Sequence, residues 1–279
     1  MLNSDTIKKI EDFVYEKPRS LLEVSEHIKK NWRTADRYVQ EIEKEFGTIS
    51  TRTFRGGTRG ALKVVYWASI EKTRANVFQD RLEQQIMQAK GKEDFSAFDI
   101  FQHVPQKDKS AWMRVGEKED RLGKLLIFKD LLLTAKKQIL FFSGNLSFIN
   151  YKYKDIDIFE ILDKLVKKGI QIKIICRVDI TGLENIQKIL SLNDKYGKEL
   201  VEIRHSEQPL RVTIIDDKHV NIKEIKEPTS RVKELNKKTF IFYDIKNKDW
   251  VNWFRRIFLK IFNSSIDAHV RIEEIKKIK

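Results

Sequence analysis

The 279-residue sequence predicts an α/β protein of two domains. Three helical patterns near the N-terminus precede a glycine-rich, basic hairpin pattern. Beyond about residue 119, short buried strands alternate with helices, which is typical of a sheet that contains parallel strands. The hydrophobic content of 41% is enough for a buried core, so the charged content of 34% indicates a solvated surface rather than disorder.

The first predicted domain covers residues 1–68 and begins with three helices. Apolar residues at helical spacing mark the first helix, which ends before Pro18 because proline disfavours helical geometry in the preceding residue. Ser20 and Glu23 have the spacing of a capping box, which predicts the start of a second helix. Asn31 is a suitable cap for a third helix.

A hairpin is predicted directly after the third helix. Residues 48–54 and 61–67 have strand composition, and the segment between them contains three glycines, which favour a turn. This order of three helices and a basic hairpin resembles the winged helix-turn-helix family of DNA-binding domains. Within it, residues 32–39 resemble the recognition helix, so the resemblance implies double-stranded DNA as the partner.

Basic side chains are concentrated in the third helix and the hairpin, and no acidic residue occurs between Gly47 and Trp67. A helix in the major groove needs polar and cationic side chains that reach base edges, and a basic hairpin suits phosphate contacts. The residues expected to contact DNA are Arg33, Thr34, Arg37, Tyr38 and Lys44 in the helix, and Arg52, Arg55, Arg59 and Lys63 in the hairpin. The alternative is a protein-interaction module whose arginines are merely solvated.

Residues 69–118 are predicted to be a helical linker. A weakly amphipathic helix over residues 69–90 is suited to joining the domains or to pairing with a second copy, so a homodimer is expected. His103 has no second histidine or cysteine at ligand spacing, and no metal or cofactor is expected.

The second predicted domain covers residues 119–279. Its segments 134–143, 165–175 and 211–216 resemble the phospholipase D-like domain, especially as it is attached to winged helices in archaeal regulators of the sugar-responsive TrmB type. The basic, aromatic helix predicted over residues 249–262 is expected to pack on the sheet, although a helix lying on a membrane surface has similar composition.

Active members of that family carry the motif HxKxxxxD, in which the histidine is the nucleophile. With Asp216 as the aspartate, Pro209 stands at the histidine position and Arg211 at the lysine position, and neither His205 nor His219 restores the motif. The resemblance therefore implies a sensing or dimerising domain rather than an enzyme. Arg204, together with His205 and Arg211, is a candidate pocket for an anionic or sugar-like effector.

The net charge of +14 favours a polyanionic partner. The single cysteine, Cys176, excludes an intrachain disulfide, and neither a signal peptide nor a transmembrane segment is recognisable, so a cytoplasmic location without membrane association is expected. We therefore expect a sequence-specific transcriptional regulator. The alternatives are a phospholipase D-like nuclease or phosphodiesterase, and a chromatin-architectural protein that coats DNA without sequence preference.

Overall fold

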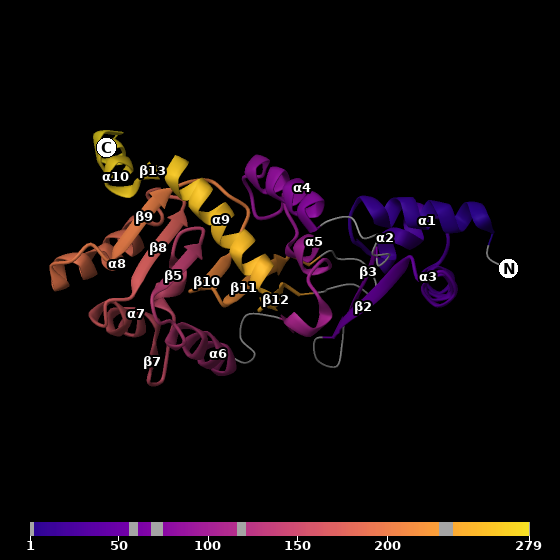
Figure 1. Ribbon diagram of the computed structural model, residues 1–279, viewed down its shortest axis with the longest axis horizontal. Coiled ribbons are helices and arrows are strands. Elements are labelled where there is room, and N and C mark those ends of the chain that lie inside the picture. Colours follow the sequence, from indigo (N-terminus) through magenta and orange to yellow (C-terminus); the bar gives the residue numbers. More distant parts are fainter. Residues whose placement is uncertain (1–2, 56–60, 68–74, 116–120, 229–236, 279) are drawn as a thin grey trace.

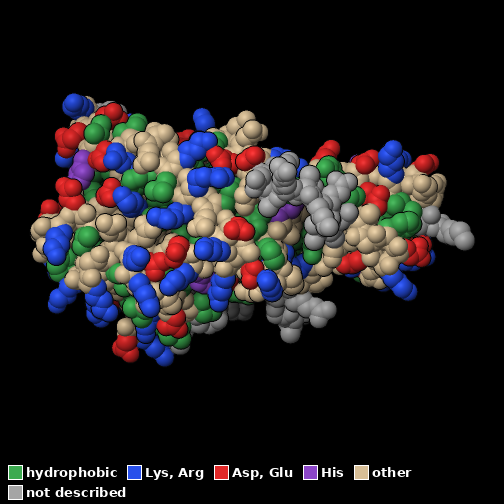
Figure 2. Space-filling model, in the orientation of Figure 1, with side chains coloured by type: hydrophobic (Ala, Val, Ile, Leu, Met, Phe, Trp, Pro, Cys, Tyr) green, Lys and Arg blue, Asp and Glu red, His purple; other side chains and the backbone are tan. Residues whose placement is uncertain are grey.

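The computed structural model of the chain describes residues 3–55, 61–67, 75–115, 121–228 and 237–278. The molecule is elongated (Figure 1). Residues 3–67, here called the N-terminal unit, lie at one end, and residues 75–278, here called the body, form the rest. Lysine and arginine side chains are spread over the visible face of the body and are interspersed with acidic side chains (Figure 2), so they form no single basic patch there.

The N-terminal unit contains three helices and a three-stranded sheet, as follows: α1 (Ser4–Glu16), β1 (Arg19–Ser20), α2 (Leu21–His27), α3 (Trp32–Glu45), β2 (Ile49–Arg55) and β3 (Ala61–Trp67). The predicted order of three helices and a hairpin is confirmed. The predicted capping box is also present, because Ser20 Oγ accepts the N–H of Glu23 at 3.2 Å and the Glu23 carboxylate accepts the N–H of Ser20 at 2.7 Å. The side chain of Asn31 caps α3 by accepting the N–H of Thr34 at 2.9 Å.

The core of the N-terminal unit fixes the orientation of α3. Ala35, Val39 and Ile42 recur at helical spacing and are fully buried against the other helices and the hairpin, where Ile49 and Val65 meet them. Because this apolar face points inward, the polar face of α3 points away from the unit.

The body is built on an eight-stranded sheet with the order β13-β9-β8-β5-β10-β11-β12-β4. Its strands are β4 (Lys109–Val115), β5 (Gln138–Phe142), β8 (Gln171–Cys176), β9 (Val201–His205), β10 (Val212–Ile215), β11 (His219–Lys226), β12 (Thr239–Ile245) and β13 (Ile266–Asp267). Strands β5, β8 and β9 are parallel, and the other neighbours are antiparallel. The mixed sheet confirms the α/β class. A separate two-stranded hairpin consists of β6 (Lys152–Tyr153) and β7 (Ile156–Asp157).

Helices cover both faces of the large sheet (Figure 1). The helices of the body are α4 (Ala75–Gln88), α5 (Ala97–Phe101), α6 (Arg121–Leu133), α7 (Ile158–Lys167), α8 (Leu183–Tyr196), α9 (Lys248–Ser264) and α10 (Ala268–Ile278). Helices α4, α5 and α9 share a core with one face, and α6, α7, α8 and α10 share a core with the other. Trp250, Trp253 and Phe254 of α9 are buried in this way, which confirms that the aromatic helix packs on the sheet. Among the described residues, no helix has the length and apolar character that crossing a bilayer requires.

The segment expected to be a linker, residues 69–118, is largely part of the body. Strand β4 pairs with β12 as an edge strand of the large sheet, and Phe98 and Phe101 of α5 lie in the core beneath it. The sequence did not reveal these two elements. Most side chains of β4 are half-buried, so buried and exposed residues do not alternate along it, and α5 is only five residues long.

The hairpin β2–β3 packs on both of its faces. One face carries Ile49 and Val65 into the core of the N-terminal unit. The other carries Phe54, which is 4% exposed, into the core of the body, with ring centroids 6.2 Å from Phe98 and 6.4 Å from Tyr243. The hairpin therefore packs between the helices of the N-terminal unit and the body.

Candidate functional site

The outer face of α3 carries most of the side chains expected to recognise DNA. Arg33 and Arg37 are exposed and lie one helical turn apart, which places them on the same face, and Lys44 near the end of the helix is also exposed. Among the described residues, no carboxylate pairs with any of these three side chains. Thr34 and Tyr38 are half-buried beside them. The face therefore presents three accessible cations, and Glu41, one turn after Arg37, is the acidic residue that shares it.

Asp36, which lies beside Arg33 and Arg37 on α3, is neutralised by a lysine of the hairpin. Lys63 of β3 forms an ion pair with Asp36, and both side chains are largely shielded, with exposed fractions of 21% and 23%. Gln40 donates a further hydrogen bond to Asp36 at 3.1 Å. Lys63 is thus engaged by α3 and, in this arrangement, cancels the charge of Asp36 next to Arg33 and Arg37.

Arg52 does not lie on the surface where a DNA contact was expected. Its guanidinium lies 5.0 Å from the ring centroid of Phe101 and 5.5 Å from that of Phe54, and it approaches the carbonyl of Ala111 at 3.5 Å. It is therefore part of the contact between the hairpin and the body. The sequence could not reveal this, because docking brings together residues that are almost 60 positions apart. Arg59 and the side chain of Arg55 lie outside the described residues.

Two cations near α3 were missed by the sequence analysis. Lys29 and Lys30 precede the cap residue Asn31, and both are exposed. Lys29 has a positive φ of 53°, which turns the chain between α2 and α3. Two consecutive lysines before a helix cap are a recognisable signal, because exposed N–H groups at a helix start also favour anions.

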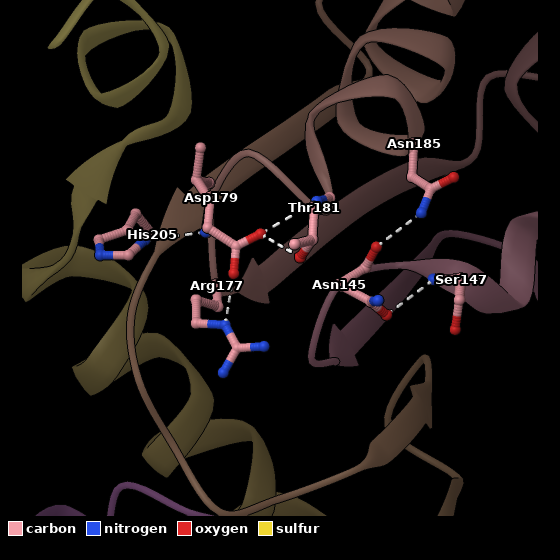
Figure 3. A network of polar contacts seen from close by, with 9 residues as sticks. Asn145, Ser147, Arg177, Asp179, Thr181, Asn185 and His205 are labelled. Atoms are coloured by element: carbon pink, nitrogen blue, oxygen red, sulfur yellow. Dashed lines mark hydrogen bonds and ion pairs between the residues drawn. The ribbon is translucent and has the colours of Figure 1, made fainter. Parts of the chain in front are cut away.

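A second polar group of residues lies at the carboxyl ends of the parallel strands β5, β8 and β9 (Figure 3). After β8, the carboxylate of Asp179 accepts hydrogen bonds from Arg177 at 2.7 Å, from Thr181 at 2.6 Å and from the N–H of Gly182 at 3.0 Å. Burial raises the pKa of Asp179, but these donors outweigh it and the pKa lies below its ordinary value. These hydrogen bonds all lie within residues 177–182, which indicates that their role is to hold the loop after β8 in its conformation.

The loop after β5 is tied to the start of α8 in the same region. Asn185 donates to the carbonyl of Asn145 at 2.9 Å, and the side chain of Asn145 accepts the N–H of Ser147 at 3.3 Å (Figure 3). A Cβ atom on Gly182 would lie 3.4 Å from Asn145, so the two loops pass each other closely. The loops after β5 and β8 therefore brace each other, while a cavity of about 270 Å³ lies beside them, at the end of β9, and is lined by residues that include His205 and Gln208.

The three residues expected to form an effector pocket have separate surroundings. Arg204 pairs with Asp267 at 3.4 Å, and its guanidinium lies over the ring of Phe262. His205 accepts the N–H of Val178 through Nδ1 at 2.9 Å, which leaves the proton on Nε2 in the neutral ring. Burial, and after it the charge of Arg271, lower the pKa of His205. Arg211 donates to the carbonyl of Leu210 at 2.7 Å. Arg211 and His205 line two different cavities, and Arg204 lines neither of these two.

The side chain of Asp216 holds the backbone in place and is not free for catalysis. Its carboxylate accepts the backbone N–H groups of Lys136 at 3.0 Å, Lys137 at 2.9 Å and Gln138 at 3.0 Å, and thereby fixes the start of β5. Burial raises the pKa of Asp216, but these three donors offset it and the pKa is lowered. Pro209 follows the buried Gln208, which donates to the carbonyl of Ser143 at 2.9 Å and accepts the N–H of Leu210 at 2.6 Å.

The two histidines near this region lie at opposite ends of the sheet. His205 pairs in register with Cys176 at the carboxyl end of β8, whereas His219 pairs with Ile215, which pairs with Ile139 near the amino end of β5. His219 also contacts the carboxylate of Asp244 at 2.8 Å. The two rings are therefore not placed to act together within one chain.

The single cysteine does not provide a reactive thiol. Cys176 is fully buried, and burial raises the pKa of its thiol to about 12, so it is not a nucleophile in the folded chain. Within the described ranges, no group of three or more histidine, cysteine or acidic side chains could hold a metal ion.

No family model and no curated protein matches the sequence. The solved structures that it resembles include the phospholipase D family member Nuc from Salmonella typhimurium, at 14% identity, a TM-score of 0.41 and coverage of 57% of this chain and 98% of Nuc. NucT from Helicobacter pylori is 16% identical, with a TM-score of 0.39 and coverage of 57% and 99%. TrmBL2, described as an archaeal chromatin protein with a novel mode of DNA binding, is 16% identical, with a TM-score of 0.39 and coverage of 95% and 94%. Similarity at this level carries no conclusion about function, which is therefore inferred from the residues of the chain itself.

Proposed function

We propose that the chain binds double-stranded DNA through a winged helix-turn-helix, with α3 as the recognition helix, and regulates transcription. The observation that carries this proposal is the exposed pair Arg33 and Arg37 on the outer face of α3, beside an aspartate whose charge Lys63 cancels. Arginine side chains one turn apart on an exposed helix are suited to guanine edges and phosphates in the major groove.

The hairpin supports this function by holding α3 rather than by supplying Arg52. Phe54 anchors the hairpin in the body, and Lys63 links it to Asp36 of α3. A recognition helix held on rigid neighbours loses less conformational entropy when it binds. Phosphate contacts then come from Lys44 and from Lys29 and Lys30, which are exposed near α3.

We also propose that the body is not catalytic. Asp216 is occupied by three backbone donors, Pro209 offers no nucleophile, and the two nearby histidines lie at opposite ends of the sheet. A sensing or dimerising role in a homodimer is the remaining proposal for the body. The nuclease alternative predicts DNA cleavage that is lost when either His205 or His219 is replaced, which a nuclease assay in chelator tests.

The regulator and the architectural protein differ in whether bound DNA has a defined sequence. The full chain is incubated with a random duplex library, bound duplexes are sequenced over several rounds, and the enriched duplex is footprinted. A regulator gives one enriched sequence and a bounded footprint, with specific binding roughly 10³-fold or more tighter than binding to random DNA. No enrichment together with uniform protection would favour the architectural alternative and would contradict sequence-specific regulation.

A further inference from the structure

Exposed lysines line one edge of the large sheet, here called the lysine edge. The parallel strands β5, β8 and β9 begin at this edge. Because β10, β11, β12 and β4 are each antiparallel to their neighbours, the turn between β10 and β11, the end of β12 and the start of β4 lie at the same edge. The exposed lysines of these six segments are Lys107, Lys136, Lys137, Lys167, Lys168, Lys198, Lys218, Lys246 and Lys248.

Backbone hydrogen bonds hold these segments side by side. The N–H of Gln171 donates to the carbonyl of Lys137 at 3.0 Å, which joins the starts of β8 and β5. The N–H of Lys246 donates to the carbonyl of Asp108 at 2.9 Å, which joins the end of β12 to the start of β4. From β9 to β4 the edge crosses six strand spacings of about 4.8 Å each, so the lysine edge is about 29 Å long.

The nine lysines outnumber the carboxylates at this edge. The carboxylates of the same six segments are Asp108, Glu199, Asp216, Asp217 and Asp249. Asp216 accepts three backbone N–H groups, and Asp108 accepts the side-chain N–H of Asn247 at 2.8 Å, so both have other partners. Within the part of the chain that the structure describes, no carboxylate forms an ion pair with any of the nine lysines. The edge therefore presents a surplus of positive charge to solvent.

We propose that the lysine edge binds the phosphate backbone of duplex DNA, at a surface separate from α3. The choice of duplex DNA among polyanions rests on the function proposed above. A duplex carries one phosphate charge per about 1.7 Å of its axis, so an edge about 29 Å long faces about 17 charges. All cations of the six segments are lysines, which are flexible point charges and suit phosphate contacts that read no sequence. The segments expose no large apolar side chain, although the adjacent Leu133 is exposed, so they offer little for insertion into a membrane.

The test measures binding of the full chain to a duplex of random sequence by fluorescence anisotropy over a range of salt concentrations. Lys137→Gln/Lys168→Gln/Lys246→Gln, the edge variant, removes a cation from each of three segments. It should lower the salt slope by about 2–3, because each lost phosphate contact lowers it by about 0.9. Lys137→Arg/Lys168→Arg/Lys246→Arg keeps the charges and should keep the wild-type slope.

A control variant separates contact at the edge from a change in overall charge. Lys8→Gln/Lys90→Gln/Lys277→Gln removes three exposed lysines outside the edge and should leave the slope nearly unchanged. Vesicles of equal parts phosphatidylcholine and phosphatidylserine test a membrane surface as the alternative partner. Equal slopes for the edge variant and the control variant would overturn the proposal. Loss of vesicle binding by the edge variant, with its slope for the duplex unchanged, would overturn it in favour of a membrane.

The lysine edge and α3 are tested separately. The edge variant should lower affinity for the enriched duplex and for random duplexes by the same factor, because backbone contacts read no sequence. Arg33→Gln/Arg37→Gln should instead remove the preference for the enriched duplex. If no duplex is enriched, sequence recognition by α3 fails, and the comparison of edge and control variants on random duplexes still decides whether the edge binds DNA.

Discussion

Asp216→Asn tests whether this aspartate holds the start of β5. Asp216 is 5% exposed and accepts the N–H groups of three consecutive residues, 136–138. Its backbone has a positive φ of 51°, a region that asparagine tolerates, so the substitution changes the hydrogen bonds without adding backbone strain.

The magnitude follows from counting the bonds. An amide oxygen in the place of Oδ1 retains the bonds from Lys137 and Gln138 but loses their charge assistance, which removes roughly 0.5–1 kcal/mol from each. The amide nitrogen cannot accept the N–H of Lys136, and leaving that group without an acceptor costs about 1–2 kcal/mol in a partly buried site. We therefore expect a loss of about 2–4 kcal/mol in the free energy of unfolding.

Chemical denaturation of the full chain, followed by circular dichroism at pH 7, measures this loss. Asp217→Asn is the matched control, because Asp217 is the exposed neighbour and the change in charge is the same. The control is expected to remain within about 0.5 kcal/mol of the wild type. If Asp216→Asn were equally neutral, the three hydrogen bonds would not stabilise the strand, and the structural role of Asp216 would be wrong.

The same carboxylate predicts a pH dependence. Because the pKa of Asp216 is lowered in the folded chain, the unfolded chain takes up a proton first, near the ordinary value of about 3.9. The stabilisation is therefore complete above that pH and is lost as the pH falls towards the folded pKa. The difference in stability between the wild type and Asp216→Asn should narrow below about pH 4, and a constant difference would contradict the charge-assisted bonds.

Three further predictions concern other parts of the chain. Asp36→Asn leaves the charge of Lys63 uncancelled beside α3. DNA affinity should therefore rise roughly two- to tenfold at low salt, which corresponds to on the order of 1 kcal/mol for one charge. An unchanged affinity in anisotropy titrations would argue against α3 facing DNA. Cys176, with a pKa raised to about 12 by burial, should resist alkylation by iodoacetamide at pH 8 until denaturant is added, and rapid labelling of the native chain would contradict its burial. Phe54→Ala should destabilise the chain by about 3–5 kcal/mol in denaturant titrations, and a loss under 1 kcal/mol would show that the hairpin is not anchored in the body.

The features that could be predicted from the sequence have local causes. The capping box of Ser20 and Glu23, the cap at Asn31 and the burial of one face of α3 all depend on residues within a few positions of each other. The alternation of buried strands and helices in the body is also a local pattern, and it gave the correct class.

The features that could not be predicted depend on contacts between distant residues. Strand β4 is half-buried at a sheet edge, so apolar and polar residues do not alternate clearly along it. Its pairing with β12, about 130 positions away, could therefore not be predicted from the sequence. Arg52 looks like any other cation of a basic hairpin, and its place against Phe101 follows from docking of the hairpin on the body.

The most direct test of DNA recognition by α3 is the salt dependence of duplex binding for Arg33→Gln/Arg37→Gln, measured by fluorescence anisotropy on the enriched duplex. Each arginine that contacts a base should contribute about 1–3 kcal/mol to affinity, and each lost phosphate contact should lower the salt slope by about 0.9. Lys8→Gln/Lys9→Gln is the control, because it removes two exposed cations from α1 of the same unit and should leave the affinity for this duplex nearly unchanged. Equal binding by the two double variants would contradict the assignment of α3 as the DNA-reading helix.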